Sequence, residues 1–390
     1  MDAHQPPATA ARVVPLDSLA TTGRPQEIVL LGASMSHLEF LAQLRAKPLT
    51  QARVTLVCPD LRMLPLDCLT DVISGDTALE DRYIDVESLA QACGVHWQRG
   101  KVAQLNLSTQ TVTLSDNRAL RFDWLSLSPR CWDKRDALGA QMPGALDHGL
   151  FSYPLERFLA LWPRVLDLHA RRTLRITVLG GGASGAELAF AIKRRLPQAA
   201  LTWLTLQTAP DPTQDAQALA LQQSLQAADI TVLHDRALAV SQGSVQLACG
   251  ATLACDVPVI AEALDAPDWL KTSALMHAAP AVPPNAPQEL HVDTWSRCTG
   301  HPQVFMASEA DSSLGHNLAA SVRGASLRAA TAPQPGWAMG IGLGPQLAVQ
   351  WPPLPLRGTL TRWAKGWHDQ RVHARYQATP AATPTEDAQP

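Results

Sequence analysis

The residue types best suited to chemistry in this sequence lie in one glycine-rich loop, GGGASG at residues 180–185. Gly180, Gly182 and Gly185 match the spacing G-x-G-x-x-G, which holds the pyrophosphate of a dinucleotide. The first glycine makes a tight turn, the second lets the backbone approach the phosphates, and the third lets a helix pack closely on a strand. Ala183-Ser184 would then open a helix whose free N–H groups face the phosphate oxygens.

Such a loop binds a dinucleotide only where a strand enters it and a helix leaves it. The apolar run at 174–179 predicts a strand, residues 187–192 predict a helix, and residues 201–206 predict the next strand. An earlier unit repeats this order, with strands predicted at 27–31 and 53–57. Two such units favour an α/β fold with parallel sheets. A glycine turn without a ligand remains the alternative interpretation of the loop.

The acidic residue that would bind the adenosine ribose, about 20 residues beyond the glycine loop, is absent. The second strand of this unit runs into Gln207, whose amide could hydrogen-bond to the ribose hydroxyls. No arginine stands beside Gln207 to pair with a 2′-phosphate, so the sequence favours NAD(H) over NADP(H).

The corresponding loop of the earlier unit, GASMSH at residues 32–37, keeps the first glycine only. Gly32 can make the turn, but Ser34 stands at the second glycine position. Its Cβ would point into the space that a pyrophosphate uses, although its hydroxyl could donate to a phosphate oxygen. Two interpretations stay open: a weakened dinucleotide site, or a unit kept for its fold alone.

Composition narrows the classes of function. The 390 residues are 46% hydrophobic and carry a formal net charge of −3, which gives no overall field for nucleic acid. The 7 cysteines form no C-x-x-C pair and the 12 histidines no HExxH pattern, so we expect neither a redox dithiol nor a metal site. No signal peptide or membrane-spanning run is evident, which predicts a cytoplasmic protein.

Taken together, the ordered segments resemble the FAD-dependent pyridine nucleotide-disulfide oxidoreductases. The resemblance is to the branch of type II NADH dehydrogenase-like proteins, including the flavoprotein domain found fused to selenide, water dikinase. It spans about residues 27–377. The segments that carry it are VLLG at 29–32, HLE at 37–39, VTLVCPD at 54–60, MLP at 63–65, FDWLSL at 122–127, PGA at 143–145, LERF at 155–158 and VLGGGASGAELA at 178–189.

This resemblance implies two Rossmann-type dinucleotide-binding domains, built from parallel sheets and β-meanders, with the second inserted into the first. The FAD-binding domain would comprise residues 26–150 and 290–330, and the NAD(P)H-binding domain residues 151–289. A C-terminal region would follow at 331–377. We expect disordered tails at the two ends, residues 1–25 and 378–390.

The resemblance also implies site residues and a reaction. His37, Glu187 and Glu309 would join the two glycine loops as cofactor-binding residues, whereas no catalytic residue can be named. Hydride would pass from NADH to FAD and on to a quinone or another small-molecule acceptor. The sequence departs from the family at Ser34, at Ala263 and at Ser308-Glu309. The alternative hypothesis is therefore a catalytically impaired pseudo-enzyme that serves as a nucleotide-sensing or protein-interaction module.

The C-terminal region offers a second kind of contact. Leu356, Leu360, Trp363 and Trp367 would share one face of a helix, with several basic residues around them. A basic amphipathic helix over 356–377 could lie in a membrane interface, at the inner face of the membrane. A helix that docks on the protein's own core is the competing prediction.

Overall fold

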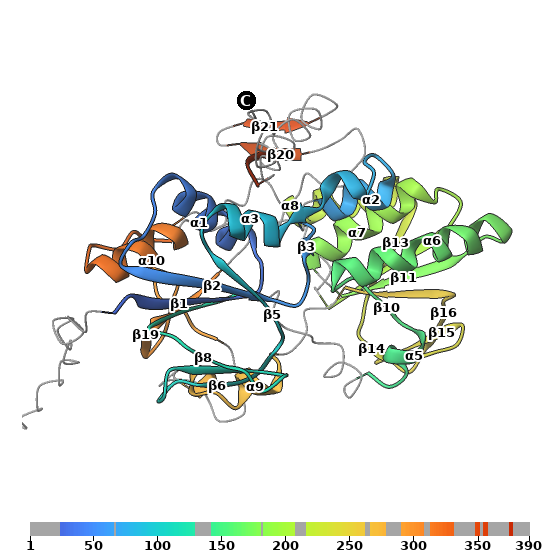
Figure 1. The fold of residues 1–390 in the computed structure, drawn as a ribbon. Helices are drawn as coiled ribbons and strands as arrows, with labels where there is room; N and C mark the ends of the chain where they lie inside the picture. Colours follow the sequence, from blue (N-terminus) through green and yellow to red (C-terminus); the bar gives the residue numbers. More distant parts are fainter. Residues whose placement is uncertain are drawn as a thin grey trace, which may run out of the picture.

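The computed structural model describes residues 24–65, 68–128, 142–180, 182–206, 216–261, 266–277, 290–307, 313–330, 348–351, 354–357 and 374–376. Two parallel sheets lie in the two halves of the molecule (Figure 1). Both follow from runs of β-branched and aliphatic residues that are buried on both faces, as parallel sheets require.

The first sheet has the order β18-β19-β9-β1-β2-β5. All of its neighbouring strands pair in parallel except β18 with β19. Its strands are β1 (Gln26–Leu31), β2 (Ala52–Cys58), β5 (His96–Arg99), β9 (Trp124–Leu127), β18 (Arg297–Cys298) and β19 (His301–Met306). Its helices are α1 (Met35–Ala46), α3 (Val86–Ala92) and α10 (Leu314–Arg323).

The second sheet has the order β10-β17-β11-β12-β13, and every pair in it is parallel. Its strands are β10 (Leu150–Phe151), β11 (Arg175–Leu179), β12 (Ala200–Thr205), β13 (Ile230–His234) and β17 (Val257–Ile260). Its helices are α6 (Leu155–Arg171), α7 (Gly182–Arg195) and α8 (Ala216–Ala227).

Short elements complete both halves. Each sheet is accompanied by an antiparallel meander, as the sequence predicted. The first meander is β6 (Val102–Asn106), β7 (Thr111–Leu114) and β8 (Ala119–Arg121); the second is β14 (Ala237–Ser241), β15 (Ser244–Leu247) and β16 (Thr252–Ala254). The remaining elements are β3 (Arg62–Met63), α2 (Leu69–Ser74), η3 (Glu80–Arg82), β4 (Ile84–Asp85), α5 (Ala145–His148), α9 (Asp268–Lys271), η5 (Ala274–His277), β20 (Ala348–Trp351) and β21 (Leu354–Arg357).

The chain leaves the first sheet after β9, builds the second sheet, and returns to add β18 and β19 beside β9. The predicted fold class, with the second unit inserted into the first, is confirmed. Two connecting segments pack across the two halves. Helix α2 follows β2 but lies against α7 (Figure 1), with Ile73 in the core of the second half. Helix α9 follows β17 but packs on β6, with Leu270 in the core of the first half. The boundaries near 150 and 289 stay a prediction.

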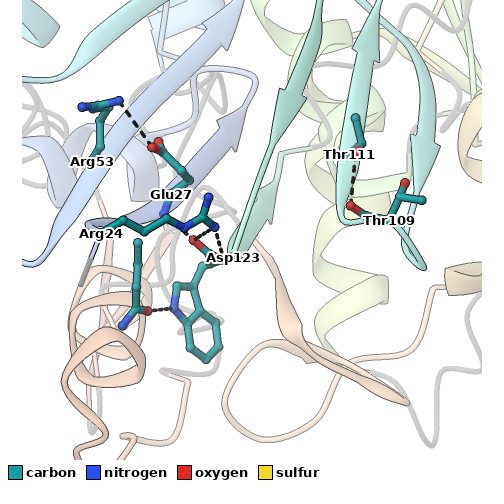
Figure 2. A network of polar contacts seen from close by, with 8 residues as sticks. Arg24, Glu27, Arg53, Thr109, Thr111 and Asp123 are labelled. Atoms are coloured by element: carbon teal, nitrogen blue, oxygen red, sulfur yellow. Dashed lines mark hydrogen bonds and ion pairs between the residues drawn. The ribbon is translucent and has the colours of Figure 1, made fainter. Parts of the chain in front are cut away.

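The duplication extends to one hydrogen-bond arrangement at the start of each sheet. In the first half, the Asp123 backbone N–H donates to Glu27 O at 2.8 Å, and its carboxylate accepts from the Glu27 backbone N–H at 2.8 Å. Arg24 adds an ion pair to Asp123 at 3.3 Å, and Arg53 pairs with Glu27 at 3.5 Å (Figure 2). This carboxylate therefore ties β9 to the first residues of β1.

The second half repeats this arrangement with Asp256, the residue before β17. The Asp256 N–H donates to Arg175 O at 2.8 Å, and its carboxylate accepts from the Arg175 backbone N–H at 2.9 Å. The guanidinium groups of Arg175 and Arg172 lie 2.9 and 3.1 Å from the same carboxylate. Arg172 precedes Arg175 by three residues, as Arg24 precedes Glu27. The two units thus share a structural clamp as well as a topology.

We expect Asp256→Asn to lower the free energy of unfolding by about 1.5 kcal/mol at neutral pH, the low end for a charged hydrogen bond, because both guanidinium groups are half-exposed. The Arg175 hydrogen bond, helped by Arg172, holds the pKa of Asp256 well below its usual range. A lowered folded-state pKa contributes stability above the unfolded-state value, about 4, which is lost as the pH falls further.

Urea unfolding at pH 7 and at pH 3 measures this contribution. The wild type should lose more stability than Asp256→Asn between the two pH values. An equal loss in both proteins would show that the clamp adds nothing at this position.

The structure corrects the start of the predicted C-terminal helix. Leu356 lies in β21, which pairs antiparallel with β20, so it belongs to no helical face. The physical reason is Pro355 together with the prolines at 352 and 353, because a residue that precedes proline avoids the helical region. Leu360, Trp363 and Trp367 lie outside the described residues. Farther on, Tyr376 is buried and donates to Glu39 Oε2 of α1 at 2.8 Å. Of the helices that the structure describes, none combines the length and apolarity needed to span a bilayer.

Candidate functional site

The second glycine loop has the backbone geometry that its sequence predicts. It connects β11 to α7, and Gly180 and Gly182 have φ values of +71° and +51°. Only glycine adopts such values without strain. The Gly180 N–H donates to Leu204 O at 2.8 Å, and Gly180 O accepts from Trp203 Nε1 at 3.1 Å. Both the N–H and the carbonyl of Gly180 are therefore hydrogen-bonded to residues of β12. These two bonds fix the turn and so the place where α7 begins.

Gly185 carries the close helix-to-strand approach in this loop. A Cβ at this position would lie 2.0 Å from Gly180 O and 2.9 Å from Trp203 Nε1. Since the nearer atom belongs to the backbone, no change of rotamer can make room. The third glycine of the pattern thus lets α7 start directly behind the turn, with its N-terminus over the end of β11.

The other residues predicted for this site are placed less completely. Ala183 and Ser184 lie in the first turn of α7, and Glu187 lies further along it, partly exposed. Gly181, Gln207, Ala263, Ser308 and Glu309 lie outside the described residues. The structure brings the three glycines of the pattern and α7 together. The contacts predicted for Gln207 and Glu309 stay predictions.

The first loop makes the same turn but finishes it differently. Gly32 has φ of +81°, and its N–H donates to Val57 O at 2.8 Å, as Gly180 does to Leu204 O. Ser34 is the N-cap of α1, and its Oγ accepts from the His37 N–H at 3.3 Å. A serine N-cap satisfies one of the helix N–H groups that a pyrophosphate would otherwise use. Ser34 is fully buried, so its hydroxyl faces the helix rather than solvent.

His37, at the third glycine position, has both ring nitrogens bonded inside the protein. Nδ1 lies 2.5 Å from Gly32 O, and Nε2 lies 2.8 Å from Ser126 Oγ in β9. A carbonyl can only accept, so Nδ1 carries the proton and Nε2 accepts from the Ser126 hydroxyl. Burial lowers the pKa of His37 from 6.5 to about 4, which keeps this tautomer neutral. His37 therefore positions the turn; neither ring nitrogen is left to contact a ligand.

A cavity of about 150 Å³ lies beside the first loop, and sequence reasoning missed most of its walls. It is lined by Gly32 and Ala33, by the end of β2 with Asp60, by Lys101, and by Tyr153, Glu156 and Arg157 from the second half. Asp60 stands where β2 ends, the place from which an acidic side chain reaches a ribose in dinucleotide folds. Its signal was in the sequence, in the run VTLVCPD. Residues 155–158 were quoted for the family resemblance, but their place beside the first loop could not be predicted, because the inserted half brings them here.

Comparison with known proteins shows which solved structures share this fold. No family model and no curated protein sequence matches the chain. Among solved structures, the sulfide:quinone oxidoreductase of Aquifex aeolicus matches with a TM-score of 0.67 at 13% identity, over 91% of this chain and 93% of its own. NDH2 of Plasmodium falciparum, solved with NADH, matches with a TM-score of 0.65 at 12% identity, over 90% and 97%.

The chain has the fold of the FAD-dependent pyridine nucleotide-disulfide oxidoreductases. A ferredoxin reductase of Rhodopseudomonas palustris shares that fold with a TM-score of 0.58 at 16% identity, over 78% of each chain. At 90% and 91% of this chain, the two longer matches cover both halves. At such low identities the similarity establishes the fold, and the chemistry must be argued from the residues of this chain.

Around the first loop, the described residues fit the adenosine and phosphate part of FAD. The positive-φ turn at Gly32, the adjoining Ala33 and Asp60 line one cavity, and α1 begins two residues after Ala33. Arg62, Lys101 and Arg157 outnumber the carboxylates Asp60 and Glu156 on its walls, and arginine and lysine favour phosphate. Ser34 works against the fit, because its hydroxyl already occupies the His37 N–H. The residues therefore fit the nucleotide with one N–H donor fewer than a glycine would leave.

Two of the described cysteines, Cys58 and Cys298, are buried structural thiols. Cys298 lies in β18, and burial raises its pKa to about 12. Burial also raises the pKa of Cys58, to about 11. A thiol reacts as its thiolate, so neither side chain is prepared for redox chemistry at neutral pH. Cys131 lies outside the described residues.

Proposed function

We propose that the chain is an FAD-dependent NAD(P)H oxidoreductase that passes hydride from NADH to the flavin and on to a quinone or another small acceptor. The second glycine loop carries this proposal: Gly180, Gly182 and Gly185 build a turn and a helix N-terminus suited to a dinucleotide pyrophosphate. The sulfide:quinone oxidoreductase and the NADH complex of NDH2 share both halves of the fold, which supports the two cofactors and a quinone acceptor.

Each cofactor would have its own loop. FAD, which supplies hydride acceptance and onward electron transfer when bound, would lie along Gly32, α1 and Asp60. NAD(H) would lie along Gly182, Ala183 and Ser184, with Gln207 and Glu187 near it. In this arrangement His37 holds the first turn in place through Gly32 O, and Trp203 holds the second through Gly180 O. We expect the Glu309 carboxylate to accept a hydrogen bond from the ribityl chain.

A second candidate function rests on one observation. Ser34 is buried and caps α1, so the first loop completes its own hydrogen bonds without a phosphate. A protein of this kind would keep the double fold and bind NAD(H) alone, as a nucleotide-sensing or protein-interaction module. The two functions differ in whether the first loop binds FAD.

We predict that Ser34→Gly raises the affinity for FAD roughly tenfold. The change removes a Cβ and frees the His37 N–H for a phosphate oxygen, a charged hydrogen bond of about 1.5–3 kcal/mol. The cost to α1 is small, a few tenths of a kcal/mol, since glycine is itself an acceptable N-cap. Fluorescence titration with FAD measures the change.

Ser34→Ala is the matched control, because it removes the hydroxyl and keeps the Cβ. It should recover part of the gain at most and should lower stability by about 1 kcal/mol through loss of the cap. Equal FAD affinity in the wild type and Ser34→Gly would show that Ser34 does not compete with the phosphate.

We predict that Gly182→Val weakens NADH binding at least tenfold. Gly182 has φ of +51° and lies where the backbone must approach the pyrophosphate, so a branched side chain would both strain the turn and block that approach. Calorimetric titration with NADH measures the affinity, and thermal unfolding shows whether the variant still folds. A folded variant with wild-type NADH affinity would refute this placement of the pyrophosphate.

A further inference from the structure

Helix α6 carries an exposed stripe on the side opposite its core face. Its buried residues are Leu155, Phe158, Leu159, Trp162 and Val165. On the other side, residues spaced i, i+4, i+7, i+11 and i+14 fall on one line along a helix. In α6 these five are Arg157, Leu161, Arg164, Leu168 and Arg171, all exposed. We call this set the α6 stripe.

Two features make the α6 stripe unusual for a surface that faces only water. Leu161 and Leu168 are 42% and 46% exposed, among the most exposed large apolar side chains that the structure describes. Within the described part of the chain, no hydrogen bond or ion pair engages the three arginine side chains. By contrast, the next arginine along the chain, Arg172, pairs with Asp256. Glu156 and Asp167 border the stripe; Asp167 is the acidic neighbour of Arg164 and Arg171 by helical spacing, and no ion pair joins them in the described residues.

We propose that the α6 stripe docks the protein on an anionic lipid surface. The three arginines have no partner among the described residues and carry one sign of charge along about 21 Å of α6, and anionic headgroups would pair with them. The two leucines project between the arginines and would enter the boundary below the headgroups. Long arginine stems suit this arrangement, because they lie along apolar surface while the guanidinium stays among phosphates.

A flat lipid surface fits the α6 stripe better than a second copy of the chain. Two copies of the stripe would place arginine against arginine in an isologous contact, and like charges disfavour that. Arg157 also borders the cavity beside the first loop, so the docked face is continuous with one wall of the candidate site. Figure 1 shows α6 at the periphery of the second half, where a surface can approach it.

Co-sedimentation of the full chain with vesicles tests this proposal without flavin or NADH, so its outcome is separate from that of the proposed function. We expect binding to phosphatidylcholine vesicles that contain phosphatidylglycerol, and little binding to phosphatidylcholine alone. Arg157→Glu, Arg164→Glu and Arg171→Glu together should weaken binding by about a hundredfold or more. Leu161→Gln with Leu168→Gln should weaken it roughly tenfold or more.

The matched control reverses three exposed arginines elsewhere, Arg121→Glu, Arg236→Glu and Arg323→Glu, which changes the net charge by the same amount. This variant should bind almost as the wild type does. Equal loss in both charge-reversed variants, or equal binding to neutral vesicles, would overturn the proposal. Failure of the wild type to bind either vesicle would also overturn the proposal. Binding of a Glu- and Leu-rich helical peptide would then indicate a protein partner.

Discussion

Gly185→Val is expected to lower the free energy of unfolding of the inserted half by more than about 3 kcal/mol, the upper end for overpacking a core. A Cβ at Gly185 would lie 2.0 Å from the Gly180 carbonyl oxygen. That oxygen cannot move away freely, because Gly180 is bonded to β12 through its own N–H and through Trp203 Nε1. Helix α7 would have to tilt off the sheet, and its buried residues Leu188 and Ile192 would lose their packing.

Thermal and urea unfolding, followed by circular dichroism, measure this loss. Gly100→Ala is a useful control, because a Cβ there meets at closest the end of the flexible Leu114 side chain, at 2.8 Å. It should cost much less than Gly185→Val. A Gly185→Val protein that unfolds at the wild-type midpoint would contradict the packing described for α7.

Stability is expected to fall as the pH is lowered from about 6.5 to about 4, with His37 contributing on the order of 3 kcal/mol to the fall. Burial lowers the folded-state pKa of His37 from 6.5 to about 4. The unfolded chain therefore takes up the proton at a higher pH than the folded chain does, so acidification through this window favours unfolding. Below about pH 4 the contribution levels off.

His37→Gln isolates this contribution. Glutamine can still donate to Gly32 O and accept from Ser126, but it does not titrate. The variant should be less stable at pH 7 and should lose less stability than the wild type between pH 6.5 and pH 4. His301→Gln is the comparison variant. Burial also lowers the pKa of His301, but His301 is partly exposed whereas His37 is fully buried. Parallel pH profiles for the wild type and His37→Gln would show that His37 is not the buried neutral group described here.

The second loop could be predicted from sequence because its determinants are local. The glycine spacing, the entering strand and the following helix all lie within residues 174–195, and the structure places each of them as expected. The parallel pairing of β1 with β2 and of β11 with β12 followed from two copies of that same pattern. The roles of the three glycines are backbone roles, which depend little on the rest of the protein.

The first loop could be predicted only in part, because its decisive partners are distant. The substitution at Ser34 was evident, but its cap on the His37 N–H depends on a rotamer. The role of His37 depends on Ser126, which lies 89 residues away on a neighbouring strand. Similarly, the cavity wall at Tyr153 and Arg157 exists only because the second half folds back beside β2.

The C-terminal helix was wrong where it began because periodicity was weighed above proline. Leu356 fits an apolar period, yet Pro355 stands directly before it and the chain forms β21 instead. The exposed stripe on α6, in contrast, was not predicted from the sequence at all. Only the first four residues of the helix, LERF at 155–158, were quoted for the family resemblance. The arrangement of arginine and leucine on the outer face becomes evident only when the buried face is known.

The most direct test of the proposed function is the visible absorption spectrum of the purified chain after incubation with excess FAD and removal of the unbound flavin, followed by anaerobic addition of NADH. We predict a bound flavin spectrum that NADH bleaches, with higher occupancy in the triple variant Ser34→Gly, Ser308→Gly and Glu309→Asp. Wild type and triple variant that both remain colourless would contradict the account and leave the fold as a module that binds NAD(H) without flavin.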